Sequence, residues 1–263
     1  MTFTWQIVLL LLCCHLLGTV PSGLIVSRLK GVDIRKHGSG NLGATNVGRV
    51  LGKKWGALVL ALDAGKGAAA SLATSAFVAR AASPWLAADP AHGDWLLLGA
   101  GLCCLLGNVA PFYLGFRGGK GVAASLGLVL GIYPYLTLPG AIAGLVWVLT
   151  VKLSGYVSLG SILAACALPL AFVGVARGSS WSLGDHYPLF CLSLLMTAFV
   201  LVRHRSNIGR LLAGTENRIG KPQSRSSPFS DGHGSAGNSR LPQPVSHQQT
   251  IRPARRILGR WRR

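Results

Sequence analysis

The chain has 263 residues, half of them hydrophobic, and only 13% are charged. An average soluble domain carries about a quarter charged residues, so this composition argues against a soluble enzyme and for a membrane protein with several spans. The net charge of +19 does not indicate nucleic-acid binding, because the basic residues lie between apolar runs without an aromatic-rich basic surface. The six cysteines lie within apolar stretches and show neither metal-site nor disulfide spacing.

Seven apolar stretches follow one another and predict an all-α polytopic membrane fold with about seven transmembrane helices, since a crossing helix needs about 20 apolar residues. The expected spans are residues 4–26, 55–79, 95–113, 121–133, 138–151, 159–175 and 187–202. Residues 121–151 could also form one bent span, but the turn signal at 133–139 favours two. The first span is expected to be retained, because no Lys or Arg precedes it and no small-residue cleavage site follows it.

This arrangement places 23 of the 26 lysines and arginines on one side of the membrane. Basic loops mark the cytoplasmic side, which predicts an N-terminus outside and a tail in the cytoplasm. From residue 221 the chain is rich in Ser, Gly, Pro, Gln and Arg and lacks the apolar residues for a core. The sequence therefore predicts a membrane domain at 1–220 and a disordered tail at 221–263, either solvated or bound to an anionic lipid surface.

Four polar clusters go beyond what membrane spanning requires, and the first covers residues 37–49. Gly38, Gly40 and Gly43 match the spacing of a dinucleotide-binding loop, but no buried strand precedes them, which excludes that reading. Glycines still allow backbone N–H groups to converge on an anion. Ser39, Thr45, Asn46 and Arg49 supply further donors. This segment is expected to bind phosphate.

The second cluster, Asp63 and Lys66, lies inside the second expected span. Ionisable groups there are paired or functional, so the two residues either form an ion pair that joins helices or contact substrate. The third cluster, residues 107–121, sets Arg117 and Lys120 among glycines where a span begins. A helix N-terminus beside these cations predicts an anion site.

The fourth cluster, residues 203–216, taken alone predicts a basic juxtamembrane helix. Near it in the expected topology, Ser158 and Ser161 open the sixth span, where hydroxyl groups commonly cap a helix. Neither feature by itself indicates a catalytic site.

Taken together in their order, these segments resemble a known family. The motifs are the Ser-Gly-Asn-x-Gly-Ala-Thr-Asn core of Gly38–Arg49, Asp63-x-x-Lys66-Gly67, Phe116-Arg-Gly-Gly-Lys-Gly-Val-Ala123, His204-Arg-Ser-Asn-Ile-Gly-Arg210 and Gly214-Thr-Glu216. The set resembles the bacterial acyl-phosphate:glycerol-3-phosphate acyltransferase family (PlsY) over about residues 4–220.

The resemblance implies a multi-pass enzyme of the bacterial inner (cytoplasmic) membrane with its site facing the cytoplasm. Such an enzyme moves a fatty acyl group from acyl phosphate to the 1-hydroxyl of glycerol 3-phosphate, giving lysophosphatidic acid and inorganic phosphate for phospholipid biosynthesis. Its partners are membrane lipid and these two substrates, and no cofactor or metal is expected.

Carried over position by position, the resemblance places Ser39, Arg49, Lys120, His204 and Asn207 at the catalytic centre. It assigns substrate or phosphate binding to Gly40, Asn41, Gly43, Thr45, Asn46, Asp63, Lys66, Asn108, Arg117, Gly118, Gly119, Gly121, Ser158, Arg210 and Glu216. Two positions depart from the family pattern: Asn108 replaces a histidine and Arg117 a lysine. Asn108 does not titrate near neutrality, which argues against proton transfer there.

An acyl phosphate is a mixed anhydride and already activated, so direct attack by the glycerol hydroxyl is expected. Lys120 and Arg49 would neutralise charge on the carbonyl oxygen and the departing phosphate. The phosphate, or else His204, would accept the proton, and an acyl-Ser39 intermediate is the alternative route. Two other classes compete with the enzyme: a transporter for a small phosphorylated anion and a non-catalytic scaffold.

Overall fold

The computed structural model describes residues 2–89 and 91–219, and every regular element in this part of the chain is a helix. The tail predicted at 221–263, with its lipid-binding alternative, lies outside the described residues. The elements are α1 Thr2–Thr19, α2 Ser22–Leu29, η1 Ile34–Lys36, α3 Ala44–Leu51, α4 Lys53–Arg80, α5 Pro84–Ala88, α6 Ala91–Val109, η2 Phe112–Leu114, α7 Val122–Gly131, α8 Thr137–Ser154, α9 Val157–Arg177, α10 Tyr187–Arg203 and α11 Arg205–Leu212.

The prediction of an all-α membrane fold is confirmed. Five helical segments are long and apolar enough to cross a membrane, and α10 with α11 makes a sixth if this pair, bent by 58°, is taken as one span. The remaining predicted span is α7, which has ten residues and is therefore about 15 Å long, half the thickness of a bilayer core. The count of seven crossings and their orientation stay predictions.

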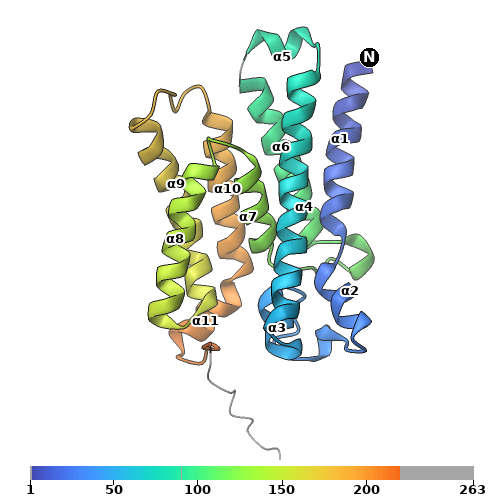
Figure 1. The fold of residues 1–263 in the computed structure, drawn as a ribbon, viewed down its shortest axis with the longest axis vertical. Coiled ribbons are helices and arrows are strands. Elements are labelled where there is room, and N and C mark those ends of the chain that lie inside the picture. Colours follow the sequence, from blue (N-terminus) through green and yellow to red (C-terminus); the bar gives the residue numbers. More distant parts are fainter. Residues whose placement is uncertain (1, 90, 220–263) are drawn as a thin grey trace, which may run out of the picture. The chain divides into compact units, whose positions relative to one another are not determined.

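The helices form two groups with α7 and α10 between them (Figure 1). On one side α1 packs on α6 and α4 packs on α7, while on the other α8 pairs with α9. Helix α10 contacts both α6 and α9 and so joins the groups. The main core lies along this junction and includes the fully buried side chains of Leu128, Phe172, Leu189 and Leu192.

Close contact between α4 and α7 depends on glycine. A Cβ atom at Gly67 would overlap the carbonyl oxygen of Ala124, and one at Gly127 would overlap that of Ala64. Small residues are the usual means of bringing membrane helices together, because lipid offers no hydrophobic drive for their association. The backbone contact fixes where α7 begins relative to the polar residues of α4.

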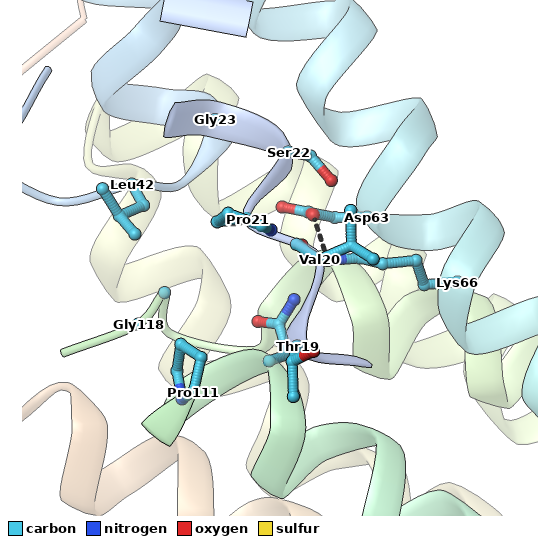
Figure 2. Close-up of a pocket in the computed structure, with 12 residues that line it drawn as sticks. Thr19, Val20, Pro21, Ser22, Gly23, Leu42, Asp63, Lys66, Pro111 and Gly118 are labelled. Carbon is cyan, nitrogen blue, oxygen red and sulfur yellow. Dashed lines mark hydrogen bonds and ion pairs between the residues drawn. The ribbon is translucent and has the colours of Figure 1, made fainter. Parts of the chain in front are cut away.

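The helix is interrupted at Val20 and Pro21, between the end of α1 and the start of α2. Lys66 holds this break from α4: its ammonium group lies 2.8 Å from the Asp63 carboxylate and donates a hydrogen bond of 2.7 Å to the carbonyl of Val20 (Figure 2). Of the two alternatives for the Asp63–Lys66 pair, the structure thus shows the helix-joining contact. A role of either residue in substrate binding stays a prediction.

A smaller apolar cluster supports the segment between α2 and α4. Its buried members are Leu24, Val26, Ile34, Leu42, Val47 and Val59. They fix both ends of residues 37–43, which have no regular structure of their own. The loop is thereby held against α4.

Replacing Gly67 with Ala should destabilise the α4–α7 contact, because the new methyl group overlaps backbone atoms. Overpacking of this kind costs about 1–3 kcal/mol, or roughly 2–4 °C in Tm per kcal/mol for a chain of this size. Gly65→Ala is the matched control, since Gly65 lies on the same helix with no heavy atom within 4 Å of an added Cβ. Both variants gain the same helix propensity, so thermal unfolding in detergent should rank Gly67→Ala below Gly65→Ala. Equal Tm values would contradict the packing argument.

Candidate active site

A cavity of about 530 Å³ lies between α3, α4 and α7 on one side and α8 to α11 on the other. This volume is in the range of small-molecule sites. One end is lined by polar and charged groups from the loop 37–43, α3, the glycine loop 118–121, and the segment from His204 to Asn217. Beyond these groups the lining is mostly apolar, and its polar members include Asp63, Asn108, Ser125, Ser158, Ser161 and Thr197. The cavity therefore combines an anion-attracting end with an apolar passage.

Asn46 organises the loop at the rim of the polar end. Its side chain is 2% exposed; the amide nitrogen donates to the carbonyls of His37 (3.1 Å) and Asn41 (2.9 Å), and the amide oxygen accepts from the backbone N–H of Ser39 (2.9 Å). All of these partners are backbone atoms, so Asn46 builds the loop. Arg49 of α3 supplies the positive charge at this rim; its side chain is exposed and lines the cavity.

The glycine loop is held in place by Arg203 from the end of α10. Its Nη2 atom donates to the carbonyl oxygens of Gly119 (2.9 Å) and Gly118 (3.5 Å). Gly121 follows with a φ of 77° and starts α7. The first turn of α7 borders the cavity, and N–H groups at a helix start have no intrahelical partners and favour an anion.

Glu216 joins the polar groups of α9 and α11. Its Oε1 atom accepts hydrogen bonds from Ser158 (2.9 Å) and Asn207 (2.7 Å), and its Oε2 atom accepts one from Arg210 (2.7 Å). Burial alone would raise the pKa of Glu216, but these three hydrogen bonds outweigh it, and the net pKa is lowered. The carboxylate is therefore ionised at neutral pH.

Lys120 completes this network by donating a hydrogen bond to the amide oxygen of Asn207. Burial lowers the pKa of Lys120 to about 8, against the attraction of Glu216 and with the help of the nearby charges of Arg210, Arg203 and Arg49. A lysine in this state is a partly desolvated cation with cations around it. A bound phosphate would supply the negative charge that the site lacks.

His204 lies at the junction of α10 and α11 and is 3% exposed. Its Nδ1 atom lies 2.8 Å from the carbonyl oxygen of Val200. A carbonyl only accepts hydrogen bonds, so Nδ1 must carry a proton, and the neutral ring keeps Nε2 as an acceptor. His204 lines the cavity and can accept a hydrogen bond from a substrate hydroxyl.

The structure brings most of the predicted site residues to this one cavity. Those that line it are Ser39, Asn41, Gly43, Thr45, Asn46, Arg49, Asp63, Asn108, Gly119, Lys120, Gly121, Ser158, His204, Asn207, Arg210 and Glu216. The four outside its lining are Gly40, Lys66, Arg117 and Gly118. Arg117 is exposed, and Gly118 turns its carbonyl toward Arg203. Their roles in binding stay predictions.

The contact of Arg203 was not predicted: this residue does not line the cavity, but it holds the glycine loop that does. Its basic neighbours in the 203–216 segment make it look like an ordinary juxtamembrane charge, and its partners lie more than 80 positions away in the chain. Sequence analysis also missed the polar lining residues Ser125, Thr197 and Asn217. A helical-wheel comparison of α7 and α10 would have placed Ser125 and Thr197 on inward faces.

The membrane helices and the cavity define a membrane-embedded protein with an internal site that has a basic polar end and an apolar passage. The family model for glycerol-3-phosphate acyltransferase matches residues 8–214. The chain belongs to the glycerol-3-phosphate acyltransferase family.

Individual relatives agree with this. The chain is 41% identical to the glycerol-3-phosphate acyltransferase of Sinorhizobium fredii over 83% of its own length and 98% of the relative. It is 43% identical to that of Shouchella clausii over 79% and 93%. Among solved structures it is similar to PlsY (YgiH), an integral membrane glycerol 3-phosphate acyltransferase, in its glycerol 3-phosphate form, with a TM-score of 0.68 and 38% identity over 82% of this chain and 96% of that one.

Replacing Arg203 with Met should weaken substrate binding, because the carbonyls of the glycine loop lose the donor that holds them. A hydrogen bond from a charged group contributes about 1.5–3 kcal/mol, so kcat/KM for glycerol 3-phosphate should fall about 10- to 100-fold. Arg205→Met is the control, since Arg205 is exposed, lies outside the cavity lining and carries the same charge. Equal losses in the two variants would show that net charge matters and the loop contact does not. Tm is measured for both.

Proposed function

We propose that this protein transfers a fatty acyl group from an acyl phosphate to the 1-hydroxyl of glycerol 3-phosphate, producing lysophosphatidic acid and inorganic phosphate. The single observation that carries the proposal is the continuity of the cavity: its polar end has basic groups for phosphate, and its apolar passage suits an acyl chain. A donor with an anionic head and an apolar tail has the same polarity pattern.

The basic groups of the polar end come from separate elements and give room for two phosphates. Arg49 extends from α3, Lys120 from the glycine loop and Arg210 from α11. Lys120 donates a hydrogen bond to Asn207. In the part of the chain that the structure describes, Glu216 is the only carboxylate that contacts this asparagine. We assign the donor phosphate to Lys120 and the start of α7, where the N–H groups and the helix dipole favour an anion.

In the proposed reaction the O1 atom of glycerol 3-phosphate attacks the carbonyl carbon of the donor. The new ester bond forms, the bond between the carbonyl carbon and the phosphate oxygen breaks, and phosphate leaves with the bonding electron pair. Lys120 and Arg49 stabilise the charge that develops on the carbonyl oxygen and the phosphate. The hydroxyl proton passes to the departing phosphate or to Nε2 of His204.

The environment of Ser39 supports direct attack over an acyl-enzyme. A serine nucleophile needs a base within hydrogen-bond reach. Among the described residues, the hydrogen bond recorded for Ser39 is from its backbone N–H to Asn46, and its side chain has no histidine or carboxylate partner. We assign Ser39 to substrate binding at the rim. Trapping of an acyl-Ser39 adduct would overturn this assignment.

The location follows from charge. The polar end is formed by basic connecting segments, and basic loops face the cytoplasm. We therefore propose a multi-pass protein of the bacterial inner membrane whose site opens to the cytoplasm, where glycerol 3-phosphate is available in water.

The donor is tested with purified protein in lipid, labelled glycerol 3-phosphate and either palmitoyl phosphate or palmitoyl-CoA. We expect lysophosphatidic acid with the phosphate donor alone. Lys120→Ala should lower kcat about 10²- to 10³-fold with the fold intact, since it removes a preorganised charge at the reacting centre. Transfer from palmitoyl-CoA, or near-normal rates in the variant, would contradict the donor or the role of Lys120. Glycerol 3-phosphate flux without transfer would identify a transporter.

The rate should also fall as pH rises through about 8, because Lys120 has its pKa lowered to about 8 and only its protonated form binds phosphate well. The profile of kcat/KM reports the free enzyme, so it should be flat below this value and decline above it. An arginine stays protonated throughout this pH range. The Lys120→Arg variant should therefore show no decline of kcat/KM above pH 8, even if its absolute rate is lower. If Lys120→Arg shows the same decline of kcat/KM at high pH as the wild type, the decline is caused by another titrating group.

A further inference from the structure

The apolar passage descends from the polar end between α7, α8, α9 and α10. Helices α8 and α9 pair along this path, and Trp147 of α8 donates a hydrogen bond of 3.4 Å to Ser161 of α9. One turn deeper, Gly144 of α8 and Ala164 of α9 line the cavity. Ala164 is six residues beyond Ser158, which places this level about 10 Å below the polar end.

Side-chain size differs sharply between successive levels of the passage. At the level of Gly144 the other lining residues of α8 and α9 are alanines: Ala143, Ala164 and Ala165. A Cβ atom at Gly144 would have no heavy atom within 4 Å. One turn deeper, a Cβ atom at Gly140 would overlap Val129. The wall of the cavity therefore has free space beside Gly144, whereas at Gly140 it is packed against Val129 and has no room for a side chain.

The residues that close the passage belong to the core of the protein. Val129, Leu168 and Met196 line its deep end and are 5%, 6% and 3% exposed. They come from three helices, α7, α9 and α10, and are part of one buried cluster. This floor is packed and does not yield without a cost in stability.

A second route for an apolar chain leads sideways. Leu60, Leu126 and Val148 line the cavity and belong to its more exposed apolar side chains, at 43%, 40% and 39%. They come from α4, α7 and α8, and an exit between these helices is the alternative route for the chain. A chain that left here would pass above Gly144, since Val148 lies one turn nearer the polar end.

We propose that the acyl chain of the donor runs inward along α8 past Gly144, and that the missing side chain at this position makes Gly144 a determinant of acyl-chain length. This inference rests on the proposed function. The small residues at this level give long chains access to the space above Val129, Leu168 and Met196. A large side chain at position 144 would leave room only for short chains.

The test compares palmitoyl phosphate with butyryl phosphate as donors for the wild type and Gly144→Leu. A butyryl chain has three C–C bonds of about 1.5 Å each and ends before Gly144, whereas a palmitoyl chain passes it. Each methylene group of the donor that can no longer be buried in the passage should lower kcat/KM about fourfold, the equivalent of about 0.8 kcal/mol. We expect Gly144→Leu to lose at least about tenfold with palmitoyl phosphate and less than twofold with butyryl phosphate.

Gly174→Leu is the matched control. Gly174 also has no heavy atom within 4 Å of an added Cβ, lies in the apolar helix α9, and is exposed outside the cavity lining. It should leave the ratio of the two donors unchanged. Ala164→Leu obstructs the passage from the opposite helix and should reproduce the loss, so the inference stays testable if Gly144→Leu fails to fold.

Folded Gly144→Leu or Ala164→Leu protein with an unchanged donor ratio would overturn the inference and favour the lateral route. Equal losses with both donors would overturn it too, because position 144 would then act on the polar end. If the wild type transfers from neither acyl phosphate, the proposed function fails, and the inference fails with it. Transfer by the wild type with an unaltered ratio in the variants refutes the inference alone.

Discussion

The site depends on one carboxylate among several cations. Glu216 accepts hydrogen bonds from Ser158, Asn207 and Arg210 and thereby ties α9 to the segment after α10. Because the amide nitrogen of Asn207 donates to Glu216, its amide oxygen is left to accept from Lys120. A single acidic group thus sets the orientation of an amide, the position of an arginine and the direction of a lysine. Replacing any of these partners changes the geometry of the others, as is usual in a connected polar network.

At the polar end the basic side chains outnumber the acidic ones, so part of their positive charge has no negative partner. Burial and neighbouring cations make the charged form of Lys120 less favourable than in water. The Nη2 atom of Arg203 donates its hydrogen bonds to the carbonyls of the glycine loop. An anion that enters this end is therefore attracted by groups already held in place, with little reorganisation required of them. The passage beyond is lined mostly by apolar side chains, so the two ends of the cavity differ in polarity in the way that the head and the tail of an amphiphile do.

Much of this could be predicted from the sequence, and the remainder could not for identifiable reasons. Apolar runs predicted the helices, and the motifs around Arg49, Lys120 and His204 predicted most of the polar lining, because glycine and basic residues in such density have few structural uses in a membrane. The short length of α7 follows from the turn signal at 133–139, but its close backbone contact with α4 does not, since no local pattern encodes the partner of a helix. Arg203 bonds only to backbone carbonyls, so no side-chain motif points to it. Gly144 stands in an apolar run like many other glycines, and only its neighbours reveal the open space beside it.

The break at Pro21 and the loop organised by Asn46 come early in the chain, Lys120 lies near its middle, and Glu216 is among the last residues of the membrane region. The groups of the candidate site are therefore distributed over almost the whole length of the membrane region, in a protein that is made from its N-terminus. During synthesis the early helices can be inserted and packed, yet Lys120 gains its amide partner only with α11 and the carboxylate behind it only with Glu216, which follows that helix. A chain that ends before residue 216 lacks the carboxylate that orients Asn207 and Arg210, so the proposed phosphate site would be incomplete in it.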